Sequence, residues 1–283
     1  MNDLVVYKPT LKSYLGALYA IAKNDWKRYW RYPLNVLSHI FQPIIWLTPV
    51  YFMGQAFSVN GQAVGFAGYS GTADYMSFIL IGSALSNFIS AVFWGMGYSM
   101  KNDMDAGVLE TNWMTPVPRP VLLIGRTFTN LLTTTVNSIV TLIIGALLFG
   151  FQVSGNIVAS LLSILPMLIG LYGFGFAFAA LVLVLKDANT LVDMGSFLVD
   201  TFSGSRFPIA ALPRWLLPVS LAIPLTYGFD AMRSWLLGTH TFLPVATEII
   251  ILLVFMVVMT VVGLVTLQVL ERRVRMKGTL AQH

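Results

Sequence analysis

Long apolar runs alternate with short polar stretches along most of this 283-residue chain. A helix that crosses a bilayer needs about 20 consecutive apolar residues, so each long run is a candidate span. The fifth run is short and carries two acids, whereas the last holds no charged residue. The pattern predicts an all-α membrane protein whose transmembrane domain covers 34–271. We place six transmembrane helices, at about 34–57, 75–100, 124–150, 157–185, 189–204 and 249–270.

The first 33 residues follow an amphipathic pattern instead. Apolar and aromatic residues recur at helical spacing on one face, and basic residues lie elsewhere around the helix. Thr10 can cap such a helix, and Pro33 disfavours helix at Tyr32. The pattern predicts a helix at about 10–32 in the headgroup layer, with its cations toward anionic lipid. A soluble helix packed on a globular neighbour is the alternative. The apolar face comprises Leu11, Leu15, Leu18, Ala22, Trp26 and Tyr29.

The composition favours a membrane protein over a water-soluble one. Hydrophobic residues make up 57% of the chain and charged residues 10%, whereas soluble domains are about 25% charged. A water-soluble enzyme is therefore excluded on the number of charges. The chain has no cysteine, and His39, His240 and His283 lie far apart. Thiolate chemistry is thus absent, and no metal site is expected.

The positive charges lie mainly on one side of the predicted spans. Lys and Arg number six in 1–33, three in 101–126 and four in the basic tail 272–283, and 58–74 and 151–156 carry none. Because basic loops stay in the cytoplasm, we expect both termini there and the spans in the plasma membrane. The net charge of +5 then reflects the membrane surface, and a nucleic-acid partner is not needed to explain it.

The longest predicted cytoplasmic loop, 101–126, contains a short helical pattern of its own. Asp103 and Asp105 suit the first turn of a helix, where the dipole favours anions. The residues at 108–114 give this helix an apolar side, and three prolines stiffen the return to the membrane. A short helix with exposed apolar groups and one acid, Glu110, suits docking into a groove on another protein. A merely solvated loop is the alternative.

Residues 205–242 also fail to form a plain span. Four prolines interrupt them, and the apolar run at 215–225 is too short to cross about 30 Å of hydrocarbon. Non-helical backbone at membrane depth needs protein or water to satisfy it. We therefore expect a re-entrant hairpin that gates the extracytoplasmic side, the alternative being a hairpin that lies on the outer leaflet. The gate candidates are Pro208, Pro213, Pro224, Tyr227, Asp230 and Arg233.

Two segments resemble a known family, the membrane subunits of ABC-2 type ABC transporters. The loop AGVLETNWMTPVPRPVLLIGR (106–126) is similar to the family's coupling segment between its second and third spans. The stretch FSGSRFPIAALPRWLLPVSLAIPLTYGFDAMR (202–233) is similar to its pattern after the fifth span. Val108 stands where the family usually has Thr, and Ile223 where Asn often precedes the proline, so the subgroup is not assigned. The number, order and topology of the spans agree over nearly the whole chain.

The resemblance implies the membrane half of an ATP-driven exporter. Such a subunit pairs with a second permease copy, here a homodimer, and with two ABC ATPase subunits. It exports amphipathic drugs, lipids or lipid-linked glycans. The helix at 10–32 is similar to the family's connecting helix, and the loop 101–121 to its coupling helix. The ATPase-coupling candidates are Asp105, Gly107, Glu110, Trp113, Pro116, Arg119, Trp26 and Arg28.

The sequence contains no Gly-x4-Gly-Lys-[Ser/Thr] phosphate loop. That loop is the usual cradle for the phosphates of ATP. We therefore expect ATP and Mg on the partner subunits, and neither a cofactor nor a catalytic residue on this chain.

Polar residues form a stripe in each of two predicted spans. Because polar side chains are costly in lipid, such stripes make either interhelical hydrogen bonds or the wall of a translocation pathway. The stripes are Ser83, Asn87, Ser90, Trp94 and Gly97 in the second span, and Asn130, Thr134, Asn137 and Thr141 in the third. Together with aromatic residues that suit an apolar route, the pathway candidates are Phe41, Trp46, Asn87, Trp94, Asn130, Asn137 and Asp200.

Two acids, Asp193 and Asp200, share one face of the short fifth span because they are seven residues apart. We favour structural pairing, of Asp193 with Lys186 and of Asp200 with Arg206. A cation site or a proton relay is the alternative, and it would suit an ion-coupled secondary transporter. Such carriers usually contain a repeat of their spans, and none is visible here.

Three further expectations concern packing and charge. Asp230 and Arg233 are spaced to form a salt bridge within one helical turn. Glu248 is expected where the last span meets the outer interface. Gly173 and Gly175 predict close helix packing in the fourth span.

Overall fold

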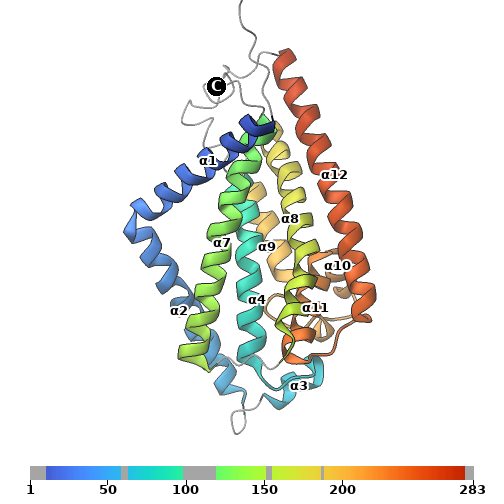
Figure 1. Ribbon diagram of the computed structural model, residues 1–283. Coiled ribbons are helices and arrows are strands. Elements are labelled where there is room, and N and C mark those ends of the chain that lie inside the picture. Colours follow the sequence, from blue (N-terminus) through green and yellow to red (C-terminus); the bar gives the residue numbers. More distant parts are fainter. Residues whose placement is uncertain (1–10, 59–62, 98–118, 151–154, 186–187, 278–283) are drawn as a thin grey trace, which may run out of the picture.

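The computed structural model describes residues 11–58, 63–97, 119–150, 155–185 and 188–277. Within these ranges every regular element is a helix, and the long helices form one elongated bundle (Figure 1). The helices are α1 (Leu11–Arg31), α2 (Pro33–Ala56), α3 (Val64–Ser70), α4 (Tyr75–Ser90), the π-helix η1 (Ala91–Gly97), α7 (Arg119–Phe149), α8 (Ile157–Leu185), α9 (Ala188–Phe202), the 3-10 turn η2 (Ile209–Ala211), α10 (Leu217–Ala222), α11 (Leu225–Leu237) and α12 (Val245–Lys277).

Four helical segments are long and apolar enough to cross a membrane. They are Tyr75–Gly97, Ile124–Phe149, Ile157–Val182 and Val245–Val269, which correspond to the predicted second, third, fourth and sixth spans. All four predictions of an apolar spanning helix are thus confirmed by length and composition.

The other two predicted spans, α2 and α9, are helical but do not meet that standard. Polar residues and two internal prolines, Pro43 and Pro49, interrupt the apolar character of α2. With 15 residues, α9 is about 22 Å long, which is shorter than the roughly 30 Å hydrocarbon core. The count of six spans therefore stays a prediction.

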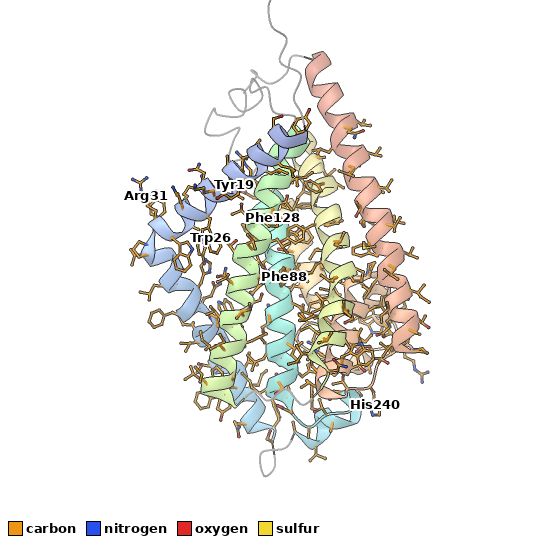
Figure 2. All side chains as sticks on the ribbon, in the orientation of Figure 1. Tyr19, Trp26, Arg31, Phe88, Phe128 and His240 are labelled. Carbon is orange, nitrogen blue, oxygen red and sulfur yellow. The ribbon has the colours of Figure 1, made fainter. Side chains whose placement is uncertain are left out.

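The amphipathic N-terminal segment forms α1, as predicted. Pro33 starts α2, and the non-helical conformation of Tyr32 (φ −109°, ψ 86°) separates the two helices, because proline restricts the residue before it and suits the first helical turn. α1 runs obliquely across one end of the bundle, and Trp26 lies in the angle between α1 and α2 (Figures 1 and 2). Its place in the headgroup layer stays a prediction.

The core lies where α8 meets its neighbours. Five side chains there are at most 1% exposed, and α4 continues into η1 beside them. They are Phe93, Met167, Leu171, Phe229 and Leu252.

Glycine allows α8 and α12 to approach closely. A methyl carbon on Gly263 would lie 2.2 Å from the Gly173 carbonyl oxygen, and one on Gly173 would lie 2.7 Å from the backbone of Met259. One on Gly175 would lie 2.8 Å from Val92 on η1. The predicted close packing at Gly173 and Gly175 is confirmed, since only residues without a side chain leave room for these contacts.

The ends of the helices segregate as the charge pattern predicts. α1, the start of α7 and the last turns of α12 lie at one end of the bundle, whereas α3, α10 and α11 lie at the other (Figure 1). Tyr19 and His240 mark these opposite ends in Figure 2. Which end faces the cytoplasm stays a prediction.

Residues 205–242 fold as interrupted short helices, in agreement with the proline pattern. Pro208 precedes η2, Pro218 lies in the first turn of α10, and Pro224 precedes α11. The His240 N–H donates to the Ser70 carbonyl at 3.1 Å, which joins this hairpin to α3. Its depth in a membrane stays a prediction.

Candidate functional site

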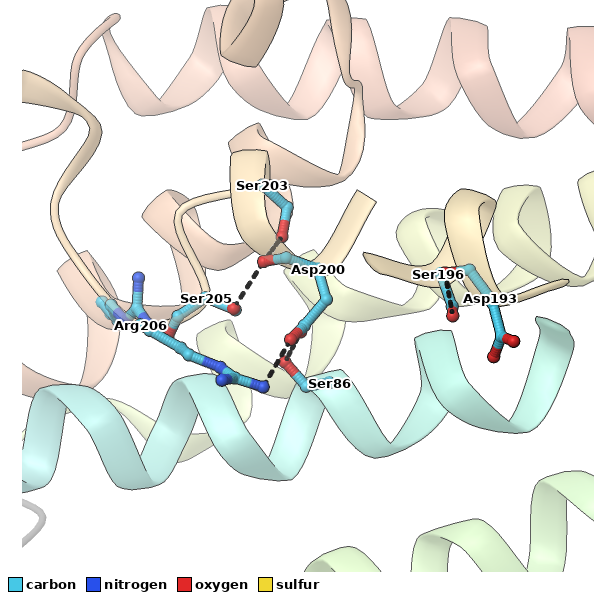
Figure 3. Close-up of polar contacts among 8 residues, drawn as sticks. Ser86, Asp193, Ser196, Asp200, Ser203, Ser205 and Arg206 are labelled. Carbon is cyan, nitrogen blue, oxygen red and sulfur yellow. Dashed lines mark hydrogen bonds and ion pairs between the residues drawn. The ribbon is translucent and has the colours of Figure 1, made fainter. Parts of the chain in front are cut away.

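Asp200, near the end of α9, lies at the centre of a polar cluster (Figure 3). The other members come from α4 and from the turn that follows α9. Asp200 Oδ1 accepts from the Ser86 hydroxyl at 2.6 Å, and its Oδ2 lies 2.8 Å from Nη2 of Arg206. The hydroxyls of Ser203 and Ser205 donate to its carbonyl oxygen at 3.2 and 2.7 Å. The predicted pair of Asp200 with Arg206 is confirmed. The Asp200 carboxylate is thus ion-paired within the chain, and a role in ion coupling stays the alternative hypothesis.

Asp193 lies two turns earlier on α9 and is exposed. Its carbonyl oxygen accepts from the Ser196 hydroxyl at 3.2 Å (Figure 3). Lys186, the expected partner of its carboxylate, lies outside the described residues.

The polar stripe of α7 serves mainly to join helices. Asn130 donates to the Ala91 carbonyl of η1 at 3.5 Å and accepts from the Tyr172 hydroxyl of α8 at 3.1 Å. Asn87 of α4 donates to Ser138 of α7 at 3.4 Å. For Asn87 and Asn130, the structure thus shows the interhelical hydrogen bonds that we kept as an alternative to a pathway wall.

Asn137, on the same helix, binds α1 rather than a neighbouring span. The Tyr29 hydroxyl donates to Asn137 Oδ1 at 3.1 Å. Burial raises the pKa of the Tyr29 phenol, so the hydroxyl stays protonated as this bond requires. Because the Tyr29 ring also stacks on His39 of α2, with 5.9 Å between ring centroids, one side chain connects α1, α2 and α7.

The stripe predicted for the second span is not a single face. Gly97 is buried against Phe178 and Val192, whereas Ser90 and Trp94 are exposed. The reason is that the span changes from α-helix to π-helix at Ala91, and a π-helix has more residues per turn. The predicted stripe therefore does not extend to Gly97.

The aromatic pathway candidates lie on the outside of the single chain. Phe41 and Trp46 of α2 and Trp94 of η1 are all exposed. Whether these rings line an apolar route stays a prediction.

Arg233 of α11 is the anchor of the hairpin. It is 2% exposed, and its Nε donates to the Phe78 carbonyl at 3.2 Å while Nη1 donates to the Gly204 carbonyl at 2.7 Å. Nη2 donates to the carbonyl of Ser205. A methyl carbon on Gly82 would lie 1.7 Å from that same Ser205 oxygen, so the absence of a side chain there makes room for the contact.

The predicted salt bridge between Asp230 and Arg233 is wrong. The arginine turns toward α4 and the turn after α9, where buried carbonyls need donors. Asp230 instead faces the loop after α11, where its Oδ2 accepts from the Phe242 N–H at 2.7 Å. The two charges still influence each other: burial raises the pKa of the Asp230 carboxyl, while the Phe242 N–H and the charge of Arg233 act to lower it.

Glu248 lies at the start of the last span, and its place at the outer interface stays a prediction. Glu248 is fully buried in the first turn of α12, and its Oε1 accepts from the Leu243 N–H at 3.3 Å. Its Oε2 has no hydrogen-bond partner within the part of the chain that the structure describes. The hairpin folds back over this end of α12 and removes the carboxylate from solvent.

The remaining gate candidates shape the hairpin itself. The Tyr227 hydroxyl donates to the Leu221 carbonyl at 2.9 Å, and Thr226 donates to Ser220 at 2.7 Å. These bonds fold α11 against α10. Pro208 and Pro224 precede the short helices η2 and α11, and Pro213 is exposed between η2 and α10.

Most coupling candidates lie outside the described residues. These are Asp105, Gly107, Glu110, Trp113 and Pro116, together with most of the loop 101–121. Of the remainder, Arg119 starts α7, Arg28 is exposed and lies 3.4 Å from Asp25, and Trp26 stacks on Tyr29 with 6.0 Å between ring centroids.

Sequence reasoning missed the approach of Asp230 to Glu248. The only available signal was that they are the sole acids between 201 and 270. Over the described ranges, no three acids or histidines cluster as a metal site would require.

Comparison with known proteins identifies the family. Residues 16–237 match the model of the ABC-2 type transporter family. Two curated relatives are both named "Probable doxorubicin resistance ABC transporter permease protein DrrC", from Mycobacterium tuberculosis strains CDC 1551 / Oshkosh and ATCC 25618 / H37Rv. Each is 30% identical over 213 residues, which cover 72% of this chain and 71% of the relative. The chain therefore belongs to the ABC-2 type transporter family and is an ABC transporter permease.

Proposed function

We propose that this permease exports an amphipathic drug, using ATP hydrolysed by separate ABC ATPase subunits. The observation that carries the proposal is the similarity over 213 residues to permeases named for doxorubicin resistance. This similarity favours a drug over the other cargo classes that the family suggests, lipids and lipid-linked glycans. The chain itself binds no cofactor in this proposal, because ATP and Mg bind to the partners.

The working assembly is a homodimer of this chain with two ATPase subunits, in the plasma membrane, with both termini in the cytoplasm. The surface of α9 supports a second copy. Met194 and Phe197 are 65% and 67% exposed, and Asp193 is exposed on the same short helix. Because an acid facing lipid is costly, this surface needs cover from protein or from an aqueous route.

The route of force runs from the loop 101–121 into α7. That loop ends in the first turn of α7, which begins at Arg119, and the bond from Tyr29 to Asn137 ties α1 to the same helix. ATP-driven closure of the partner subunits pushes on the loop and α1 and shifts the bundle as rigid bodies. The hairpin 205–242, anchored by Arg233, then acts as the outer gate.

The proposal is tested in cells that express the chain together with its ATPase subunit. We expect lower accumulation of doxorubicin than in cells that lack the chain. The double variant Glu110→Arg with Trp113→Ala should lose both the export and the co-purification of the ATPase. Trp215→Ala, at an exposed tryptophan of the hairpin, is the matched control for co-purification and should retain the ATPase.

Two outcomes contradict the proposal. Unchanged co-purification of the ATPase with the double variant removes the docking role of the loop. Uphill movement of doxorubicin by the purified chain alone, in vesicles without nucleotide, removes ATP as the energy source.

A further inference from the structure

Two carboxyl groups come together where α11 meets the start of α12. Asp230 accepts from the Phe242 N–H and Glu248 from the Leu243 N–H, so both bind consecutive amides of one loop. Each carboxyl lies within hydrogen-bonding reach of the other. Glu248 is 0% exposed, and its Oε2 lacks a hydrogen-bond donor among the described residues. A buried polar atom without a partner is uncommon in proteins and calls for an explanation.

The surroundings supply too little positive charge for two carboxylates. On α11, the charged or titratable neighbours are Arg233 and Tyr227. The three guanidinium nitrogens of Arg233 donate hydrogen bonds to three backbone carbonyls. Neither α8, which packs against both α11 and α12, nor α4 carries a charged residue. In the loop, the backbone and ring of His240 contact Ser70 and Gly71, next to α3.

We propose that Asp230 and Glu248 form a proton-binding site, in which a single proton is shared between their carboxyl groups. With that proton the site holds one negative charge, which Arg233 offsets. Without it, two buried like charges face each other, which disfavours ionisation of both. The proton also gives Glu248 Oε2 its missing partner, because a carboxylic acid donates a strong hydrogen bond to a neighbouring carboxylate.

The consequence is a joint between the hairpin and α12 that depends on pH. While the proton is bound, the carboxyl pair holds α11 and the following loop against the first turn of α12. Loss of the proton places like charges across that contact and loosens it. The site requires neither a particular cargo nor the ATPase subunits, so it goes beyond the proposed function and can fail independently of it.

The experiment is an infrared pH titration of the purified chain in lipid nanodiscs. We expect a protonated-carboxyl C=O band near neutral pH that disappears as the pH rises, together with a fall in thermal stability. In Glu248→Gln the band should be missing and the stability should no longer fall over that pH range, because Asp230 alone is balanced by Arg233. Asp193→Asn, which changes an exposed acid on α9, is the matched control for the band, and its protonated-carboxyl band should titrate as in the wild type.

A second variant, Asp230→Asn, covers the case in which Glu248→Gln does not fold. It leaves Glu248 without a carboxyl partner, so its band should disappear at a different pH from that of the wild type. Absence of the band from the wild-type protein overturns the inference. The inference is also overturned if the band disappears at the wild-type pH in whichever of the two variants folds.

Discussion

The guanidinium of Arg233 lies 3.5 Å from the centroid of the Phe78 ring, and its Nε donates to the carbonyl oxygen of that same residue. One arginine of α11 therefore holds both the ring and the backbone of α4. Its other nitrogens hold the turn after α9. This relationship joins the hairpin to the centre of the bundle.

Arg233→Met should lower the free energy of unfolding by about 3 kcal/mol or more, since each buried acceptor left unpaired costs roughly 1–3 kcal/mol. Thermal unfolding of the purified protein measures the change. Arg214→Met, at an exposed position of the same hairpin, is the control and should unfold like the wild type. An unchanged unfolding temperature for Arg233→Met would show that the carbonyl bonds contribute nothing.

Gly82→Ala should disrupt the same junction from the side of α4. The new methyl carbon would lie 1.7 Å from the Ser205 oxygen and 2.3 Å from Nη2 of Arg233, so the backbones must move apart. Overpacking of this kind costs about 1–3 kcal/mol, and a lower unfolding temperature is expected. Gly68→Ala is the matched control, because nothing lies within 4 Å of its added carbon. Equal unfolding temperatures for the two variants would contradict the close contact.

Arg206→Gln should have only a small effect on stability, within about 1 kcal/mol, because exposed ion pairs contribute little. The side chain of Arg206 is 67% exposed. Asp200→Leu should be more harmful, since it also removes the acceptor of the Ser86 hydroxyl. The comparison is made by thermal unfolding, and equal losses in the two variants would mean that the bond from Ser86 to Asp200 does not matter.

Asp200→Asn tests the pathway directly. If Asp200 is structural, as its contacts indicate, this variant should export doxorubicin at close to the wild-type rate when expressed with the ATPase subunit. The measurement is the initial rate of efflux. A loss of export in a variant of normal stability would return Asp200 to the translocation pathway.

Tyr29→Phe should weaken the link between α1 and α7 while leaving the fold intact. It removes one hydrogen bond, to Asn137, which is worth about 1 kcal/mol. In the assembled transporter we expect less cargo exported per ATP hydrolysed, because α1 no longer moves together with α7. Tyr19→Phe, on the exposed side of α1, is the control, and an equal ratio in the two variants contradicts the proposed route of force.

The helices were predictable because their signals are local. Apolar runs marked α7, α8 and α12, and the pair Tyr32 and Pro33 marked the break between α1 and α2. Local spacing could not find partners that the fold brings from far away. Arg233 binds carbonyls of residues 78, 204 and 205, and a backbone acceptor leaves no mark in a sequence. The same limit explains Glu248, whose burial depends on the return of the hairpin.

The π-helix η1 gives the second span two angular phases. Up to Ser90 the side chains follow the 100° step of an α-helix, and from Ala91 to Gly97 each residue advances by less. A helical wheel drawn from Tyr75 with the α-helical step therefore becomes inaccurate over the last seven residues of the described span, Ala91–Gly97. If residues of this span are replaced one at a time by cysteine, the reactivity of the cysteines should vary with one period up to Ser90 and with a longer period from Ala91. The two parts of the span therefore have to be analysed separately.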